Sequence, residues 1–193
     1  DTCPVCKSPV TREGSEVALR CENPACPAQL KRKLQHFASR QAMDIEGLGE
    51  AVIEQLIDRK LVGDYAGIYE LGMSDIVSLE RMGKKSAGNL ISSIEKSKNN
   101  SLSRLIFALG IRHVGIHAAE ILASRYRNME SLRRAAVEEL EAIYEIGKVM
   151  AESICSFFRM KGTMDILERL VSAGLRMEEQ EMKGNLLLKG KTF

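Results

Sequence analysis

The sequence has no tryptophan, only 5% aromatic residues and only four threonines among its 193 residues. Because β-sheets favour aromatic and β-branched side chains, this shortage predicts a mainly helical fold. No apolar run approaches the roughly 18–20 residues that cross a bilayer, which excludes a membrane-spanning helix. An initiator methionine and a secretion signal are also missing, so we expect a piece of a longer protein that resides in the cytoplasm.

The charges of the chain are ordinary in number but unevenly distributed. The net charge is only +2, with 45% hydrophobic and 28% charged residues, as in soluble globular proteins. Residues 41–80 carry nine carboxylates against two basic side chains, whereas residues 81–134 carry eleven basic side chains against three glutamates. The basic block is either a binding surface for an anionic partner or a set of solvated helix faces.

Four of the five cysteines fall within the first 26 residues, in two closely spaced pairs. Two residues separate Cys3 from Cys6, four separate Cys21 from Cys26, and fourteen lie between the pairs. Four thiolates suit the tetrahedral geometry of Zn²⁺ and leave no position open for water. The spacing therefore predicts a structural zinc site with these four ligands.

A β-hairpin is expected between the two cysteine pairs. Val10 can pair with residues 17–19 around a turn at residues 13–15, which returns the chain to the metal. The alternative is two disulfides of a secreted domain, but nothing else indicates secretion, and Cys155 would stay unpaired. Cys155 itself lies in an apolar helical stretch and is assigned to the core.

A helix is predicted to begin at Pro27, a suitable first helical residue. Leu30, Leu34 and Phe37 share one face of this helix, and the basic residues 31–33 occupy the rest. The basic residues either flank a phosphate backbone or are simply exposed to solvent.

A short pattern recurs four times in the remaining sequence. Each copy has two apolar residues three positions apart, then a glycine, then a small or apolar residue four positions later. The glycines are 34, 32 and 32 residues apart, which is too regular for coincidence. The copies are residues 45–49 with Ile53, residues 79–83 with Ala87, residues 111–115 with Ala119, and residues 143–147 with Ala151.

Each glycine is followed by apolar residues at helical spacing and preceded by a predicted short helix. The preceding helices are expected to include residues 74–78, 102–108 and 137–142. The fold class is therefore mainly α, a small four-cysteine zinc finger with a short β-hairpin followed by four helix-hairpin-helix repeats. The apolar faces predicted after the glycines are Val52, Ile53, Leu56 and Ile57; Leu90, Ile91 and Ile94; Ala118, Ile121 and Leu122; and Val149, Met150, Ile154 and Phe157.

The glycine corner suits a phosphate. The apolar residues fix the angle between the helices, while the glycine permits a sharp turn and keeps a side chain out of the way. The first N–H groups of the second helix have no intrahelical partner and carry partial positive charge. A phosphate held by main-chain amides reports no base identity, so binding is expected to be independent of sequence. The alternative is that each glycine only caps a helix in an ordinary helical array.

The four repeats differ in charge. The first, with Gly47 and Gly49, lies among carboxylates and is expected to repel DNA and to pack within the protein. The second and third are expected to bind phosphate best, and the fourth is intermediate. His113 could donate to a phosphate or merely cap its hairpin. The candidate DNA-binding residues are Gly83, Lys84, Lys85, Gly110, Arg112, His113, Gly115, Gly147 and Lys148, with Arg104, Arg125 and Arg127 near the third repeat.

The four cysteines followed by four such repeats resemble the middle and C-terminal part of bacterial NAD-dependent DNA ligases. The stretches that carry the resemblance are residues 26–29, 44–49, 82–87 and 108–115. Residues 188–193 resemble the first strand of the BRCT domain that ends those ligases. The resemblance divides the chain into a zinc finger at 1–30, a helix-hairpin-helix domain at 31–177, and a linker with a truncated BRCT strand at 178–193.

The resemblance also implies an activity for the parent protein, the sealing of nicks in duplex DNA during replication and repair. In such ligases an active-site lysine takes AMP from NAD, the AMP passes to the 5′-phosphate, and the 3′-hydroxyl displaces it. The finger and the repeats help to encircle the duplex and grip its backbone along the minor groove. A monomer in the bacterial cytoplasm is expected.

The nucleotidyl lysine of that family belongs to a Lys-x-Asp-Gly motif, and this sequence contains no Asp-Gly dipeptide. We therefore expect the chain to have no catalytic residue, to bind zinc and nicked duplex but neither NAD nor AMP, and to need the upstream ligase segments for activity. Two alternatives remain open: a stand-alone repair or junction-binding adaptor, and a zinc-finger scaffold for protein partners without affinity for DNA.

Overall fold

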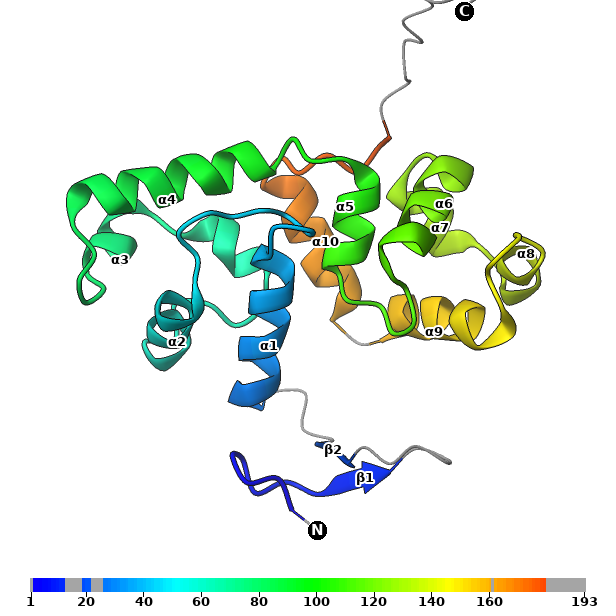
Figure 1. The fold of residues 1–193 in the computed structure, drawn as a ribbon, viewed down its shortest axis with the longest axis horizontal. Coiled ribbons are helices and arrows are strands. Elements are labelled where there is room, and N and C mark those ends of the chain that lie inside the picture. The colour runs from blue at the N-terminus through cyan, green and yellow to red at the C-terminus, as the bar shows by residue number, and fades with distance from the viewer. Residues whose placement is uncertain (1, 13–18, 22–25, 161, 180–193) are drawn as a thin grey trace, which may run out of the picture.

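The computed structural model describes residues 2–12, 19–21, 26–160 and 162–179. Within them the fold is mainly helical, as predicted, and none of these helices is long and apolar enough to cross a bilayer. Figure 1 shows the small sheet at one end and the helices gathered beyond it. The elements are β1 (Val10–Arg12), β2 (Leu19–Cys21), α1 (Pro27–Ala38), α2 (Glu50–Asp58), the 3₁₀-helix η1 (Ala66–Glu70), α3 (Met73–Val77), α4 (Lys84–Ser97), α5 (Leu102–Ala108), α6 (Ile116–Tyr126), α7 (Met129–Arg134), α8 (Val137–Glu141), α9 (Lys148–Arg159) and α10 (Thr163–Ser172).

The predicted β-hairpin forms between the cysteine pairs. Strands β1 and β2 are antiparallel, with Val10 opposite Cys21 and Arg12 opposite Leu19. The pairing places Cys21 at the end of β2, where its thiol can face the first cysteine pair. The turn predicted at 13–15, and residues 17 and 18, lie outside the described residues, as do positions 180–193 of the predicted linker and terminal strand.

Helix α1 joins the finger to the helical body through the predicted apolar face. Leu34 and Phe37 are fully buried, and Leu30 is half-buried against the core. The Phe37 ring stacks on that of Tyr65, with centroids 4.9 Å apart. One continuous apolar core then runs through the repeats to α10, and it includes Cys155, as predicted.

The four glycine patterns form one recurring turn. We name them by their residues: the first hairpin (45–49), the second (79–83), the third (111–115) and the fourth (143–147). In each, the N–H of the fourth residue donates to the carbonyl of the first, at 3.0 to 3.3 Å. The first apolar residue is buried in the first three hairpins and half-buried in the fourth. The apolar pair therefore anchors each turn in the core.

The repeats associate in pairs through their turns. In the first pair, the Glu46 N–H donates to Ser93 Oγ on α4 at 2.7 Å, and the Glu80 N–H donates to Gln55 Oε1 on α2 at 2.6 Å. Each hairpin is thus held by the other repeat's second helix. In the second pair, Glu145 of the fourth hairpin contacts His117 of α6 at 2.7 Å. Figure 1 shows α3 and α4 at the opposite end of the molecule from α8 and α9.

Helix α10 returns to the first pair of repeats, where it contacts η1. Its Arg169 donates to Asp64 Oδ2 at 2.6 Å and to Glu70 Oε1 at 2.7 Å, beside η1. These carboxylates raise the pKa of Arg169, and the hydrogen bond that Arg169 donates to Glu70 contributes most. The last helix is therefore fastened to a segment about a hundred residues earlier in the chain.

Two expectations need correction. Val149 was placed on the apolar face of α9, but 62% of it is exposed, and Phe158 is buried instead. The first hairpin is also not directly preceded by a short helix, because α1 ends at Ala38 and a turn fills residues 39–43. In that turn the carbonyl of Ser39 accepts from the N–H groups of Ala42 and Asp44.

Candidate metal centre and nucleic-acid interface

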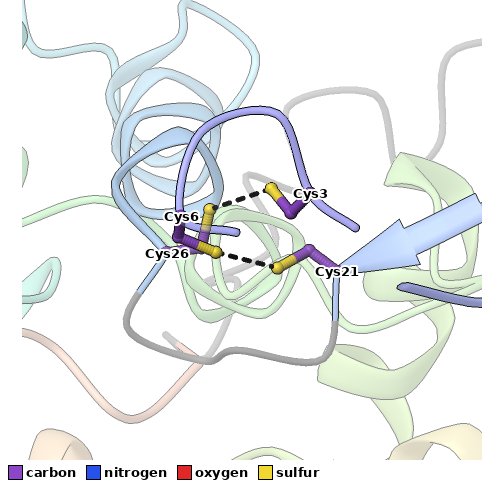
Figure 2. Close-up of side chains that lie close together, drawn as sticks. All are labelled: Cys3, Cys6, Cys21 and Cys26. Carbon is purple, nitrogen blue, oxygen red and sulfur yellow. Dashed lines mark hydrogen bonds between the residues drawn. The ribbon is translucent and has the colours of Figure 1, made fainter. Parts of the chain in front are cut away.

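The four predicted zinc ligands converge on one point (Figure 2). All four Sγ atoms lie within 4.8 Å of one another, and no disulfide joins them. Cys3 Sγ lies 3.9 Å from Cys26 Sγ, and Cys6 Sγ lies 3.4 Å from Cys21 Sγ. Cys3 and Cys26 are buried and the other two are half-buried.

This arrangement fits a tetrahedral zinc ion. Zinc–sulfur bonds of about 2.3 Å place the sulfur atoms of a tetrahedron about 3.8 Å apart, close to both measured separations. A disulfide needs about 2.05 Å between sulfurs, so the cluster is not two bridges at these distances.

Main-chain groups of the first cysteine pair support the same site. The N–H of Lys7 donates to the Cys3 carbonyl at 2.9 Å, and the N–H of Cys3 donates to the Ser8 carbonyl at 2.8 Å. Hydrogen bonds from the backbone of Cys6 and then Val5 hold the pKa of the Cys3 thiol below its usual value. The turn thus favours the thiolate, which is the form that binds a metal.

The glycine that begins the second helix of each repeat is exposed and unobstructed. Nothing lies within 4 Å of the position that a Cβ would take at these residues. Each is the N-cap of its helix, so the first N–H groups of that helix have no intrahelical partner. The four glycines are Gly49, Gly83, Gly115 and Gly147.

The backbone does not require glycine at these four positions, contrary to the expectation that glycine makes the sharp turn. Their φ angles lie between −84° and −77°, in a region open to any residue. The sharp turn falls two residues earlier, where φ is positive in every hairpin. That position is occupied by Gly47 (87°), Arg81 (59°), His113 (65°) and Glu145 (71°).

The second hairpin presents the basic surface that was predicted. Lys84 and Lys85 follow Gly83 directly, and both are exposed. Arg81 at the turn is exposed as well. Three cations thus surround the open start of α4.

The third hairpin is less basic at its tip than its sequence indicated. Arg112 is half-buried, whereas His113 is exposed at the left-handed turn position. Gly110 has a φ of 66°, and a Cβ there would approach the His36 ring at 3.4 Å, so the fold itself accounts for that glycine. Arg104 donates to the Ala42 carbonyl at 2.7 Å and therefore supports the turn after α1 instead of standing beside the hairpin.

The fourth hairpin carries Lys148 directly after Gly147, and both are exposed. Its turn residue Glu145 faces His117, the second residue of α6. The third and fourth hairpins are therefore neighbours on one side of the molecule.

The first hairpin is acidic and packs within the protein, as expected. Glu50 and Glu54 both form ion pairs with Lys31 of α1, and Lys31 Nζ lies 2.6 Å from Glu50 Oε1. Lys31 therefore connects α1 to α2. The hairpin packs on α4 through Gly47, where a Cβ would meet Leu90 at 3.7 Å. Gly49 takes no part in that packing.

Sequence reasoning missed that the four turn residues share one left-handed backbone conformation. The signal was available, because placing the hairpins in register aligns Gly47 with Arg81, His113 and Glu145. It also missed the pairing of repeats by Gln55 and Ser93, for which the repeat pattern holds no signal.

Three family models match the chain. The model of the NAD-dependent DNA ligase C4 zinc finger domain matches residues 2–28. A SAM-like helix-hairpin-helix tandem matches residues 39–96, and a helix-hairpin-helix motif matches residues 104–167. The two helical matches coincide with the two pairs of repeats.

Curated relatives match over the whole chain. A DNA ligase from Anoxybacillus flavithermus is 51% identical over 99% of this chain, and one from Halothermothrix orenii is 48% identical over all of it. A DNA ligase from Pelotomaculum thermopropionicum is 51% identical over 99%. The chain spans only 28% to 29% of the length of these relatives.

Proposed function

We propose that this chain, which is homologous over its whole length to a segment of bacterial DNA ligases, is the part of such an enzyme that holds duplex DNA without reading its sequence. The whole enzyme would seal nicks with NAD as the source of AMP. The proposed DNA-binding residues lie in the second, third and fourth hairpins or directly beside them: Gly83, Lys84, Lys85, Gly110, Arg112, His113, Gly115, Gly147 and Lys148.

One observation carries the proposal: glycine recurs at four helix starts, where neither the backbone conformation nor the packing of neighbouring side chains requires it. The backbone conformation there suits any residue, and a Cβ would meet open space. Glycine at these positions leaves room for something outside the protein to approach the main chain closely. A phosphate that accepts from the amides of a helix start has this requirement.

The contacts would be made by main-chain amides, assisted by lysines. Amides that bind phosphate fix the register of a duplex on the protein but do not distinguish bases. Lys84, Lys85 and Lys148 add charge that attracts DNA and releases its counterions. Because the first hairpin is lined by glutamates, its contribution to binding would be the smallest.

Zinc would have a structural role. Cys3, Cys6, Cys21 and Cys26 would hold it with four thiolates, and the metal would supply folding energy to a segment that has few apolar residues. The finger would thereby be fixed to α1, whose exposed Arg32 and Lys33 extend the basic surface.

The chain would have no ligase activity of its own, since residues 1–193 contain no Lys-x-Asp-Gly motif. Incubation with labelled NAD should leave the purified chain unlabelled. A stable lysyl-adenylate on this chain would contradict that part of the proposal. Monomeric state, residence in the bacterial cytoplasm and preference for nicked duplex belong to the same proposal.

A salt titration tests the DNA-binding function. Fluorescence anisotropy would follow binding to a labelled duplex of about 24 base pairs, intact or nicked, at about 50 and 200 mM NaCl. If about five phosphates are contacted, the affinity should fall roughly 10²–10³-fold between these concentrations. Two duplexes of unrelated sequence should bind equally. The absence of binding at the lower salt concentration would refute the function.

A further inference from the structure

The fourth hairpin presents apolar side chains to solvent on both sides of its helix start. Tyr144 is 86% exposed, and Val149 is 62% exposed. A single exposed apolar residue is common and needs no explanation. Here two of them flank Gly147 and Lys148 at the start of α9, and we call them the Tyr144–Val149 pair.

The other hairpins have different residues at these two places. Where the fourth hairpin has Tyr144, the other three have Glu46, Glu80 and Arg112. Where it has Val149, they have Ala51, Lys85 and His117. The apolar pair is therefore a property of the fourth hairpin and not of the repeat.

The fold does not use the Tyr144–Val149 pair. The turn is anchored by buried Ile146 and half-buried Ile143, between which the N–H of Ile146 donates to the Ile143 carbonyl at 3.0 Å. Glu145 holds the turn against His117 of α6. Tyr144 thus projects from a backbone that is fixed on both sides, so its ring is presented in advance of any contact.

We propose that the Tyr144–Val149 pair lies against the deoxyribose and base edges of the minor groove, next to the phosphate held by the fourth hairpin. This inference rests on the proposed DNA-binding function. A phosphate bound at the start of α9 brings its attached sugars to whatever side chains flank that helix start. Sugar faces are apolar, and minor-groove proteins commonly place apolar side chains against them or between base steps. A tyrosine suits this place because its ring is apolar while its hydroxyl stays in water.

The pair would give the fourth hairpin a contact that differs in kind from that of the second. Lys84 and Lys85 bind by charge, so their contribution weakens as salt rises. An apolar contact releases no counterions, and its contribution should be similar at all salt concentrations. The two kinds of contact can therefore be separated by experiment.

The test compares variants of the whole chain by anisotropy with an intact duplex at several salt concentrations. Tyr144→Ala should weaken binding about fivefold to tenfold at every concentration and leave the slope of log affinity against log salt unchanged. Lys148→Ala should reduce that slope by about 1. Val171→Ala provides the matched control, since Val171 is an exposed apolar residue of α10, 56% exposed, away from the hairpins.

The outcomes distinguish this inference from the proposed function. If Tyr144→Ala and Val149→Ala both bind like the unaltered chain while that chain shows the expected salt slope, DNA binding stands and the inference is overturned. The same result would be expected if the pair were a docking surface for a protein. A change in slope for Tyr144→Ala would overturn it too. Tyr144→Phe should bind normally, because it keeps the ring.

A second readout avoids mutation. Tyr144 is the exposed one of the four tyrosines, since Tyr65 is buried and Tyr69 and Tyr126 are half-buried. Burial raises the pKa of Tyr69 to about 12, which disfavours the phenolate that nitrating reagents attack. Nitration followed by mass spectrometry should therefore modify Tyr144 in the free chain. Saturating duplex at low salt should protect it, and undiminished nitration in the complex would overturn the inference.

Discussion

Gly47 and Gly49 lie two residues apart in the first hairpin and have opposite backbone conformations. Gly47 has a φ of 87° and would place a Cβ 3.7 Å from Leu90, whereas Gly49 has a φ of −81° and would place one in open space. Of the two, only Gly47 has a backbone conformation that favours glycine. The conformation of Gly49 recurs at Gly83, Gly115 and Gly147, where a Cβ would also meet open space.

Gly47→Ala should destabilise the protein more than Gly49→Ala. An L-residue in the left-handed region costs about 1–2 kcal/mol, so Gly47→Ala should lower the free energy of unfolding by about that amount. Gly49→Ala should lower it less, by about 0.5 kcal/mol, because alanine is a poorer N-cap than glycine but the conformation there suits any residue. Urea unfolding followed by circular dichroism measures both. Equal losses would show that the N-cap glycine contributes as much to stability as the glycine with positive φ.

Gly83→Asp and Gly115→Asp should each weaken binding to duplex DNA by about tenfold or more. The new carboxylate would stand where a phosphate must approach, and like charges repel at this range. The matched variants Gly83→Ala and Gly115→Ala test for steric effects alone and should lose less. All four should unfold at nearly the temperature of the unaltered chain, because nothing lies within 4 Å of the added Cβ.

The first hairpin provides the comparison for that experiment. Gly49→Asp should have a smaller effect on DNA affinity than Gly83→Asp, since Glu46 and Glu50 already make that hairpin acidic. Equal losses of affinity at Gly49, Gly83 and Gly115, with folding preserved, would contradict the ranking of the repeats.

Removal of one zinc ligand should unfold the finger and spare the helices. Cys21→Ser leaves three thiolates, and metal binding and folding of such a segment are coupled. We expect zinc content, measured by elemental analysis, to fall from about one ion per chain to well below that. The helical signal of circular dichroism should persist. Cys155→Ala is the control, because Cys155 is buried among apolar residues on α9 and should leave the zinc content unchanged.

Arg169→Ala should weaken the attachment of α10 to η1. Arg169 is 39% exposed and pairs with two carboxylates, so we expect a loss of about 1 kcal/mol in the free energy of unfolding, at the upper end for exposed pairs. The loss should shrink in about 1 M NaCl, where the screening length is only about 3 Å. Arg134→Ala is the comparison, because Arg134 is 73% exposed and pairs within its own helix. If Arg134→Ala lowers the free energy of unfolding as much as Arg169→Ala, the pairing with η1 contributes no more to stability than an ordinary surface pair.

The sequence was sufficient to predict what depends on local spacing. The cysteine pairs, the hairpin between them and the four glycine corners each need only neighbouring residues, and all were found by counting positions. The buried face of α1 followed from helical periodicity for the same reason.

Long-range contacts could not be predicted in this way. Nothing in the pattern around Arg104 indicates that it donates to the Ala42 carbonyl, and nothing around Arg169 indicates its partners Asp64 and Glu70. Val149 was misplaced because periodicity identifies an apolar face but not where that face stops being covered. The reason for glycine at Gly49 was misassigned because a sequence does not reveal the sign of φ.

The fastening of α10 to η1 has a mechanical consequence. It connects α10 with the first pair of repeats, in addition to the chain that joins α4 to α5 and to the contact of Arg104 on α5 with the Ala42 carbonyl. Each such connection restricts the movement of one part of the array relative to the other. A duplex held as proposed above would then have to adjust its own curvature and twist, so the stiffness of the DNA would influence which duplexes are held well.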